Sequence, residues 1–276
     1  MNKNSYQTTL EKALSSSELA LKSTLPDSAR LDCQLITAHV LGKPRSWVIS
    51  HGDFVLSTPQ IRQIERLTKL RQENTPIAYI LNEKEFYRRK FYCDDRALIP
   101  RPESEQIISS MLDILPKTPL SIIDVGCGSG VLGITAKLEN PNWQLTLSDI
   151  SKQAIDVATR NVKNFGLSSN VSIIQYDLLP TDKYYDVVIA NLPYVPTNLI
   201  GKSDISFEPK MALFAGEDGL DSYRQLFAQL QSRRDRPTFL FIESHSDQQA
   251  ELINMAQSCR YSLIKKTKFT LALKQN

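Results

Sequence analysis

Apolar positions in the first 75 or so residues recur every three or four residues, the spacing of one helix face. We expect one helix to be capped by Asp27 or Ser28 and to end at Gly42. A second should have Thr58 as its N-cap and Pro59 in its first turn. The repeating positions are Leu31, Leu35, Ala38 and Val40, then Ile61, Ile64, Leu67 and Leu70. This region is predicted to be a small helical domain.

The pattern changes after residue 76. Aromatic and charged residues alternate between Glu85 and Tyr92, as expected of exposed strands in a hairpin. Beyond about Leu115, short apolar strands alternate with helical stretches, which predicts βαβ units and a parallel, doubly wound sheet. The predicted strands are 121–124, 145–148, 171–174, 186–189 and 238–242, with 261–264 and 269–273 closing the sheet as a hairpin. The expected domains are a helical recognition domain at 1–75, a hairpin linker at 76–100 and an α/β domain at 101–276.

The composition is that of an ordinary soluble globular protein, with 41% hydrophobic and 23% charged residues. A net charge of +3 is too small to indicate nucleic-acid binding, which usually needs a concentrated basic face. The cysteines Cys33, Cys93, Cys127 and Cys259 form no CxxC pair, so neither a disulfide framework nor a zinc site is predicted, and a cytoplasmic location is expected. Residues 1–7 lack an apolar core and no long apolar stretch follows, so no signal peptide or membrane span is expected.

A glycine-rich turn follows the first predicted strand of the α/β region. The strand ends at Asp124 and leads into Gly126-Cys127-Gly128-Ser129-Gly130 and then a helix. Glycines let the backbone turn sharply and approach a ligand, and the order strand, turn, helix is that of a nucleotide-type site. A dinucleotide fingerprint would need glycine where this chain has Val131. The GxGxG spacing, with an acid before it, suits a positively charged ligand without a pyrophosphate, such as S-adenosylmethionine.

Asp149 is predicted to end the second strand, close to the roughly 20-residue interval at which an acid meets ribose hydroxyls. Its carboxylate can accept both hydroxyl protons of a ribose. The alternative is that Asp149 caps the helix that follows from Ile150. Asp177, after the third strand, either flanks an adenine ring together with Leu178 or caps a turn, and the sequence leaves these two open.

The fourth strand leads into the loop Asn191-Leu192-Pro193-Tyr194, at the strand end that faces the ligand crevice in such sheets. The Asn191 side-chain carbonyl and a loop backbone carbonyl can each accept one N–H of a planar amide or aromatic amine. Tyr194 can stack on that planar group. Positioning of this kind can supply roughly 7–11 kcal/mol of a barrier, with no general base or metal ion. The alternative is a tight turn in which Asn and Pro serve the backbone and Tyr fills the core.

These residues resemble a class I methyltransferase with an Asn-Pro-Pro-Tyr-type loop, and adjoining segments narrow the resemblance. Ala97-Leu98-Ile99-Pro100-Arg101-Pro102-Glu103-Ser104-Glu105 is similar to the signature before the catalytic domain of HemK-like release-factor glutamine methyltransferases. The segments 76–80 and 85–87 are similar to that family's hairpin. The segments 208–210 and 213–221 resemble its stretch after the catalytic loop, and 38–42 its helical N-terminal region. The resemblance covers nearly the whole chain.

The resemblance implies a Rossmann-like catalytic domain after a helical domain and a hairpin linker. It also implies methyl transfer from S-adenosylmethionine to the side-chain nitrogen of the glutamine in the Gly-Gly-Gln motif of class I release factors. The cofactor would contact 126–130, Asp149 and Asn191, and the substrate would contact 191–194. Arg101 and Glu103 lie in a stretch that is near the active site in the related proteins. A structural salt bridge is the alternative for Arg101.

One residue departs from the family's pattern, because Leu192 stands where the loop usually has proline. Only its backbone carbonyl is asked to accept a hydrogen bond. The loss is the fixed φ of proline, a preorganisation effect of about 0.4–1 kcal/mol, so we expect activity to be retained. The letters Asn-Leu-Pro-Tyr also occur in ribosomal RNA adenine dimethyltransferases, so the loop alone leaves the substrate open.

Three alternatives remain at this point. An adenine methyltransferase acting on RNA or DNA would need a basic surface for the strand. The basic runs 88–90 and 265–268 are best interpreted as solvated surface, since acids dilute the first of them. A glutamine methyltransferase for a ribosomal protein would differ in the stretch 101–105, and a non-catalytic subunit would tend to lose the intact loop. We therefore expect a monomer without stable nucleic-acid binding, with proximity to the ribosome as an option.

Overall fold

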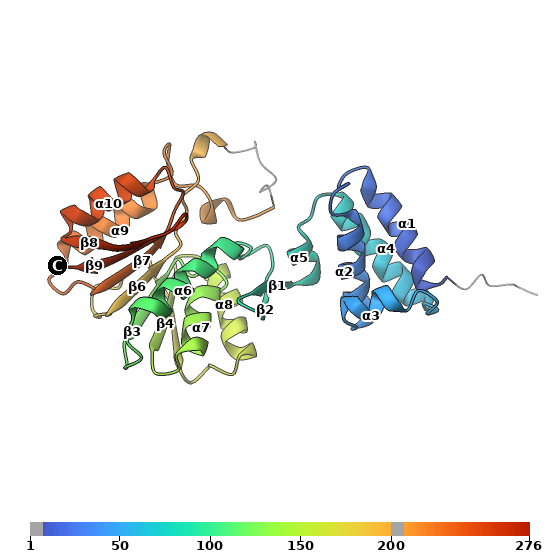
Figure 1. Cartoon of the computed structure of the whole chain (residues 1–276), viewed down its shortest axis with the longest axis horizontal. Coiled ribbons are helices and arrows are strands. Elements are labelled where there is room, and N and C mark those ends of the chain that lie inside the picture. The colour runs from blue at the N-terminus through green and yellow to red at the C-terminus, as the bar shows by residue number, and fades with distance from the viewer. Residues whose placement is uncertain (1–7, 200–206) are drawn as a thin grey trace, which may run out of the picture. The chain divides into compact units, whose positions relative to one another are not determined.

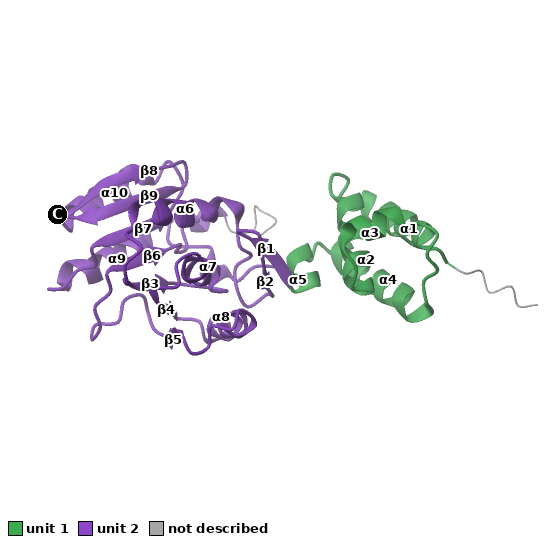
Figure 2. Cartoon of the chain, turned by 60° about the horizontal axis from the view of Figure 1, so that its bottom comes forward, with its two compact units in different colours: residues 1–82 green, residues 83–276 purple. Residues whose placement is uncertain are grey.

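The computed structural model describes residues 8–199 and 207–276. The chain divides into two compact units, residues 1–82 and 83–276, which Figure 2 shows in different colours. The division falls between Asn82 and Glu83, and the hairpin predicted as a separate linker belongs to the second unit.

The first unit is helical. Within it, the described residues form α1 (Leu10–Lys22), α2 (Ala29–Leu41), α3 (Arg45–Ser50), α4 (Thr58–Gln72) and α5 (Ile77–Leu81). Helix α2 has Ser28 as N-cap and ends at Gly42, as predicted, with Gly42 in the left-handed conformation.

Two expected details of the helical unit are wrong. The buried face of α2 carries Cys33 and Ile36, whereas Leu31, one of the apolar positions that repeat along one helix face, is 44% exposed. The N-cap of α4 is Ser57 rather than Thr58, because Ser57 and Gln60 form a capping box that satisfies backbone N–H groups at the helix start. Tertiary packing decides which apolar residues of α2 are buried. The side-chain hydrogen bonds between Ser57 and Gln60 decide which residue caps α4.

The stretch from Ile77 to Ile99 is also corrected. Its first residues form α5 instead of continuing the hairpin, and only Glu83–Phe86 (β1) and Arg89–Tyr92 (β2) pair as antiparallel strands. These strands are not exposed on both faces, since Phe86 and Phe91 are fully buried. The Phe91 ring lies 4.8 Å from the ring of Phe165, centroid to centroid, so aromatic burial ties the hairpin to the α/β unit.

The second unit contains a seven-stranded sheet with the order β5-β4-β3-β6-β7-β9-β8 among its described residues. Strands β3 to β7 of this sheet are parallel, and β9 pairs antiparallel with both β7 and β8. The C-terminal hairpin therefore closes the sheet, as predicted. The strands are β3 (Ser121–Val125), β4 (Gln144–Asp149), β5 (Val171–Gln175), β6 (Val187–Ala190), β7 (Phe239–Glu243), β8 (Tyr261–Lys266) and β9 (Thr270–Gln275).

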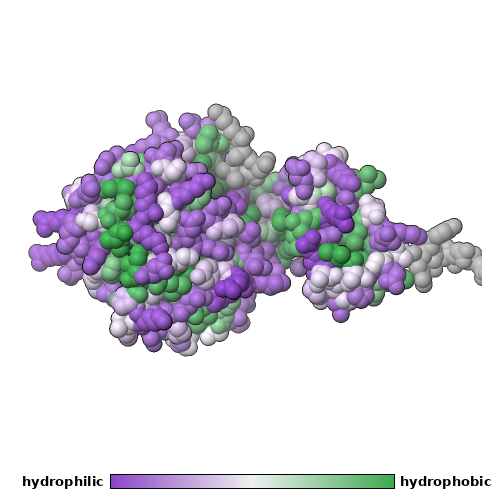
Figure 3. Space-filling model, in the orientation of Figure 1, coloured by the Kyte–Doolittle hydropathy of each residue, from purple (hydrophilic) through white to green (hydrophobic). Residues whose placement is uncertain are grey.

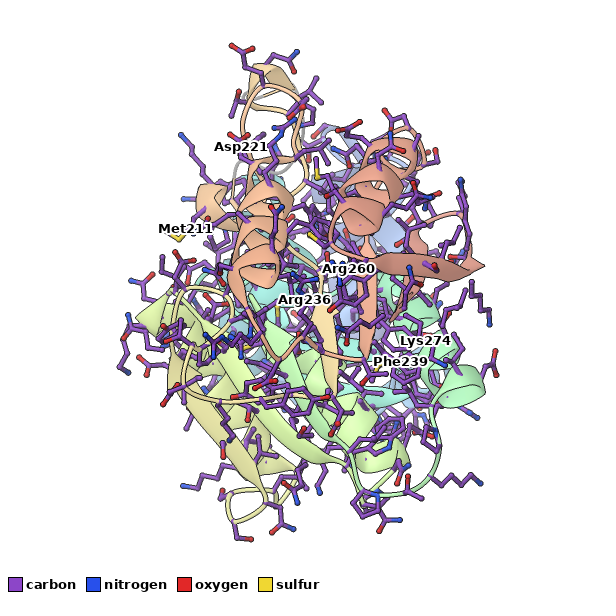
Figure 4. All side chains as sticks on the ribbon, turned by 90° about the vertical axis from the view of Figure 1, so that its left-hand side faces the viewer. Met211, Asp221, Arg236, Phe239, Arg260 and Lys274 are labelled. Atoms are coloured by element: carbon purple, nitrogen blue, oxygen red, sulfur yellow. The ribbon has the colours of Figure 1, made fainter. Side chains whose placement is uncertain are left out.

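Helices cover both faces of this sheet (Figure 1). The apolar side chains of α6 (Glu105–Ile114), α7 (Val131–Glu139) and α8 (Lys152–Asn164) pack on one face. Those of α9 (Asp221–Ser232) and α10 (Gln249–Ser258) pack on the other, and Figure 4 shows these two helices side by side in front of the strands. Alternate residues of each strand enter the two apolar clusters, so the sheet is buried on both sides. Short 3₁₀ turns occupy 102–104, 197–199 and 210–212.

Hydrophilic residues cover much of the face seen in Figure 3. In the part of the chain that the structure describes, no helix combines the length and apolar character that crossing a membrane requires.

The register of the parallel strands brings the predicted site together. Val125 of β3 lies opposite Ser148 of β4 and Ala190 of β6, and Ala190 lies opposite Ile242 of β7. The residues that follow these positions therefore emerge at one edge of the sheet. That edge, outside the carboxyl ends of the strands, is where α/β sheets bind ligands.

Candidate active site

The glycine turn has the backbone that its sequence predicts. Gly126, Gly128 and Gly130 all have positive φ, at 63°, 54° and 78°. Residues with a Cβ rarely adopt this region, so glycine is required for the turn itself. Gly130 is the N-cap of α7. The Cys127 side chain is buried, and the Ser129 carbonyl accepts a hydrogen bond of 2.9 Å from Asn161 Nδ2, so both residues hold the turn in place.

Two carboxylates support this turn from beneath. Asp124 is 1% exposed, and its Oδ2 accepts a 2.9 Å hydrogen bond from the Gly133 backbone N–H. Asp149 is 8% exposed and accepts from Gly128 N at 2.9 Å and from Ser151 N at 2.8 Å. The cap of α8 is Ser151 rather than Asp149, so the alternative of Asp149 as a helix cap is wrong.

The electrostatics of this pair fit a positively charged ligand. Burial, together with the nearby charge of Asp149, raises the pKa of Asp124 to about 7, against the hydrogen bond from the Gly133 backbone N–H. Burial likewise raises the pKa of Asp149, against the hydrogen bonds that it accepts from backbone N–H groups. Two ionised carboxylates that are buried close together repel each other. A cation bound nearby would reduce this repulsion and favour the ionised form of both groups.

The third-strand residues lie where β5 ends. Asp177 is exposed, and its Oδ2 accepts a 2.7 Å hydrogen bond from Gln225 on α9. Leu178 is buried with φ at 62°, and its carbonyl accepts from Ser148 Oγ at 3.2 Å. The Asp177 carboxylate is thus hydrogen-bonded to α9, and the Leu178 backbone is hydrogen-bonded to the end of β4.

The loop after β6 is held at every residue except its proline. Asn191 Nδ2 donates to Ser104 Oγ at 3.2 Å, and Leu192 N donates to Tyr223 Oη at 3.3 Å. Tyr194 Oη donates to Glu243 Oε1 at 3.3 Å. The Leu192 side chain is 3% exposed within the apolar cluster under α9 and α10. Leucine at this position therefore packs and donates a backbone hydrogen bond, which a proline would lack.

The segment that follows the loop folds back against it. Val195 N donates to Leu213 O at 2.8 Å, and Ala215 N donates to Val195 O at 3.0 Å. Gln248 of the β7–α10 connection donates to the carbonyl oxygen of Tyr194 at 2.9 Å. Gly219 has φ at 76°, and a Cβ there would lie 2.1 Å from that same carbonyl oxygen. Glycine is thus required here for the segment to approach the loop.

Arg101 has the role that the sequence left as an alternative. Its guanidinium lies 2.5 Å from Glu208 Oε1, and Glu208 is only 6% exposed. The other Glu208 oxygen accepts from Ile99 N at 3.0 Å. Arg101 and Glu208 therefore join the stretch before α6 to the segment after the loop. Glu103 is exposed, and its negative charge raises the pKa of Glu243.

A small cavity opens beside the loop. Its volume is about 40 Å³. A site that holds one water needs about 10–15 Å³ on this measure, so the cavity has room for roughly three water molecules. Its lining includes all four loop residues together with Leu98, Arg101, Val195, Ala212, Leu213 and Glu243. The loop therefore lines the same cavity as Leu98 and Arg101.

Three further residues complete the site. Glu243 and Tyr223 anchor the loop, and Ser104 contacts Asn191. Ser104 lies in the signature stretch 97–105, although no role was predicted for it, and Glu243 left a signal as an acid directly after the predicted apolar strand 238–242. Among the described residues, no group of three or more His, Cys, Asp or Glu side chains could hold a metal ion.

Comparison with known proteins places the chain in a family. Residues 12–81 match the model of the PrmC N-terminal domain, and 107–202 match the methyltransferase small domain. A release factor glutamine methyltransferase of Leptospira interrogans is 32% identical over 239 residues, 83% of either chain. One of Mycoplasma mycoides is 36% identical over 213 residues, 75% of either chain.

Solved structures agree on the architecture. The hMettl16 catalytic domain, in complex with a 3′UTR hairpin, aligns over 80% of this chain and 82% of its own, with a TM-score of 0.56 and 16% identity. At that identity the likeness shows the fold alone. The relatives of higher identity show the family, because they match most of the chain and the family models match both the helical unit and the α/β unit. The chain belongs to the release factor glutamine methyltransferase family.

Proposed function

We propose that this protein transfers a methyl group from S-adenosylmethionine to the side-chain amide nitrogen of the glutamine in the Gly-Gly-Gln motif of class I peptide chain release factors. The names of its relatives support the release factor and the glutamine. The geometry beside Asn191 supports a planar nitrogen with two hydrogens as the acceptor of the methyl group.

The observation that carries this proposal is the orientation of Asn191. Its Nδ2 is engaged by Ser104, so Oδ1 is the atom left to accept an N–H of the substrate. An amide nitrogen is a weak nucleophile because its lone pair is delocalised. Acceptors for both of its hydrogens, from Asn191 Oδ1 and the Leu192 carbonyl, stabilise the positive charge that develops as the methyl group arrives.

The cofactor is assigned to the glycine turn and its two carboxylates. Gly126 to Gly130 provide a close backbone approach, and a Cβ on Gly128 would meet nothing within 4 Å, so the turn is open on that side. Asp149 is the residue proposed for the ribose hydroxyls, and Leu178 for one side of the adenine. When bound, S-adenosylmethionine supplies an electrophilic methyl group on a positively charged sulfur. Asp124 and Asp149 provide negative charge that favours binding of such a cation.

The test is methyl transfer from labelled S-adenosylmethionine to purified release factor, with the motif glutamine intact or changed to alanine. We expect label on the intact factor only, and mass spectrometry should find one added methyl group on that glutamine. Ribosomal protein fractions and ribosomal RNA serve as competing acceptors in parallel reactions. Label on both versions of the factor, or on RNA alone, would exclude the proposed substrate.

A further inference from the structure

Glu243, at the end of β7, is a buried acid that the glycine turn and the loop do not by themselves explain. Its side chain is 1% exposed and lines the cavity beside Asn191. Oε2 has no hydrogen-bond partner among the residues that the structure describes. A buried ionisable oxygen without a partner costs stability. Neighbouring donors such as the Ser104 hydroxyl reduce that cost.

The loop is connected to Glu243 by three separate routes. Tyr194 Oη donates directly to Oε1 at 3.3 Å. Leu192 N donates to Tyr223 Oη, which in turn donates to the Glu243 backbone carbonyl. The Ser104 hydroxyl and the Asn191 amide interact with the carboxylate, and both lower its pKa against the effect of burial. Glu243 is thus the common anchor of the loop.

Ser104 transmits the charge of Glu243 into an orientation of Asn191. A serine hydroxyl has one hydrogen, and a carboxylate can only accept, so that hydrogen is directed to Glu243. Towards Asn191, Ser104 Oγ must then accept, which requires the Nδ2 side of the amide. The flipped amide would place two acceptors against each other. With an ionised Glu243, Oδ1 is therefore directed away from Ser104.

We propose that Glu243 is a positioning residue of the methyl-transfer site: through Ser104 it fixes the Asn191 amide with Oδ1 available to the substrate. This inference rests on the proposed function for the identity of the donor to Oδ1, a primary amide. A charged acceptor binds the Ser104 hydroxyl more strongly than a neutral one, so the ionised carboxylate of Glu243 holds this orientation.

The decisive variant is Glu243→Gln, which keeps the shape and can keep the acceptor for Tyr194. It replaces one carboxylate oxygen by an NH₂ group, which donates instead of accepting, so that the Ser104 hydroxyl can donate to Asn191 Oδ1 in the flipped amide. We expect kcat to fall by about 100-fold or more, with cofactor affinity within a few-fold of wild type and a melting temperature equal or higher. Ser104→Ala should lower kcat by a smaller factor, and the exposed Glu251→Gln on α10 serves as the matched control with unchanged kinetics.

A second measurement does not depend on the substrate. The side-chain NH₂ resonances of Asn191, recorded by NMR from pH 5 to 9, should shift in wild type with the titration of Glu243, whose pKa burial raises to about 7. That shift should vanish in Glu243→Gln. If wild type does not label release factor but the shift is present, the proposed substrate is wrong and the link from Glu243 to Asn191 stands. Full kcat in Glu243→Gln, or an Asn191 resonance indifferent to that variant, would overturn the inference.

Discussion

Leu192 lies directly against Gly126, so that a Cβ on Gly126 would fall 2.8 Å from Leu192 Cδ2. The turn assigned to the cofactor and the loop assigned to the substrate are therefore in van der Waals contact. Close packing of this kind leaves little free volume, so a change in one segment displaces the other.

Gly126→Ala should damage both functions of the site. It introduces a positive-φ alanine, which costs about 1–2 kcal/mol, and it also displaces the buried Leu192. Gly166→Ala is the matched control, because Gly166 has φ at 69° and a Cβ there meets nothing within 4 Å. We expect similar backbone strain in both variants, but a loss of cofactor affinity of tenfold or more only in Gly126→Ala. Thermal unfolding and calorimetric titration with cofactor check this, and equal affinities would contradict it.

Asn191→Ala should abolish methyl transfer while the cofactor still binds. Removing one preorganised acceptor from such a site typically costs about 100- to 1,000-fold in kcat. The glycine turn and Asp149 are untouched, so cofactor affinity should stay within a few-fold. Asn164→Ala, at the exposed end of α8, is the control and should behave as wild type. Single-turnover kinetics with labelled cofactor measure the step, and normal turnover in Asn191→Ala would show that the loop is misassigned.

Asp124 predicts a pH dependence of stability. Burial raises its pKa from 3.8 to about 7, so the folded state holds this proton more tightly than the unfolded state. The associated stability is fully present below pH 3.8 and is lost as pH rises through about 7. Asp124→Asn, which can still accept from Gly133, should lose less stability over that range. Urea unfolding of both proteins from pH 5 to 8.5 measures the difference, and parallel curves would refute the assignment.

Cofactor affinity should show the opposite trend with pH. A cationic ligand favours the ionised form of Asp124, so binding to wild type should tighten as pH rises through about 7. In Asp124→Asn the affinity should be weaker and nearly independent of pH. Isothermal titration at several pH values, in buffers of different ionisation enthalpy, gives both the affinity and the protons released.

The ion pair of Arg101 and Glu208 should contribute to stability more than an exposed pair does. Arg101→Ala leaves a buried carboxylate without its cationic partner, at a cost of about 1–3 kcal/mol. Arg224→Ala breaks exposed pairs with Asp218 and Asp221 and should cost at most about 1 kcal/mol.

A double variant tests whether Arg101 stabilises the fold or binds the substrate. In Arg101→Ala combined with Glu208→Gln, the buried charge is gone and much of the stability should return. If Arg101 instead bound the release factor, the double variant would recover its melting temperature but not its KM. Steady-state kinetics of the single and double variants distinguish the two outcomes.

Much of the fold followed from the sequence because periodicity and turn chemistry act between near neighbours. Alternating apolar strands and helical stretches predicted the parallel sheet and its closing hairpin, which the structure confirms. The order of glycine turn, Asp149 and the loop predicted their common place at the carboxyl ends of the strands. Both ends of α2 and the start of α4 were predicted to within a residue, and Ser57 replaced Thr58 because Gln60 completes the capping box.

Burial and contacts between distant segments could not be predicted from the sequence in the same way. The hairpin residues Phe86 and Phe91 alternate with charges as an exposed strand would, yet helices of the α/β unit cover them. Leu31 repeats at helical spacing but faces solvent. Local spacing defines an apolar face without saying whether another element covers it, so these outcomes required the packed structure.

The loop with which the candidate chemistry begins shows the same division. Its residue types alone predicted that the methyl acceptor is a planar nitrogen and that Asn191 binds it. Only the tertiary structure brought Ser104 and Glu243 to that side chain from segments distant in the chain, and their hydrogen bonds decide which end of the Asn191 amide remains free. Side-chain types are local information, whereas the orientation of a side chain depends on contacts that exist only after the strands have paired.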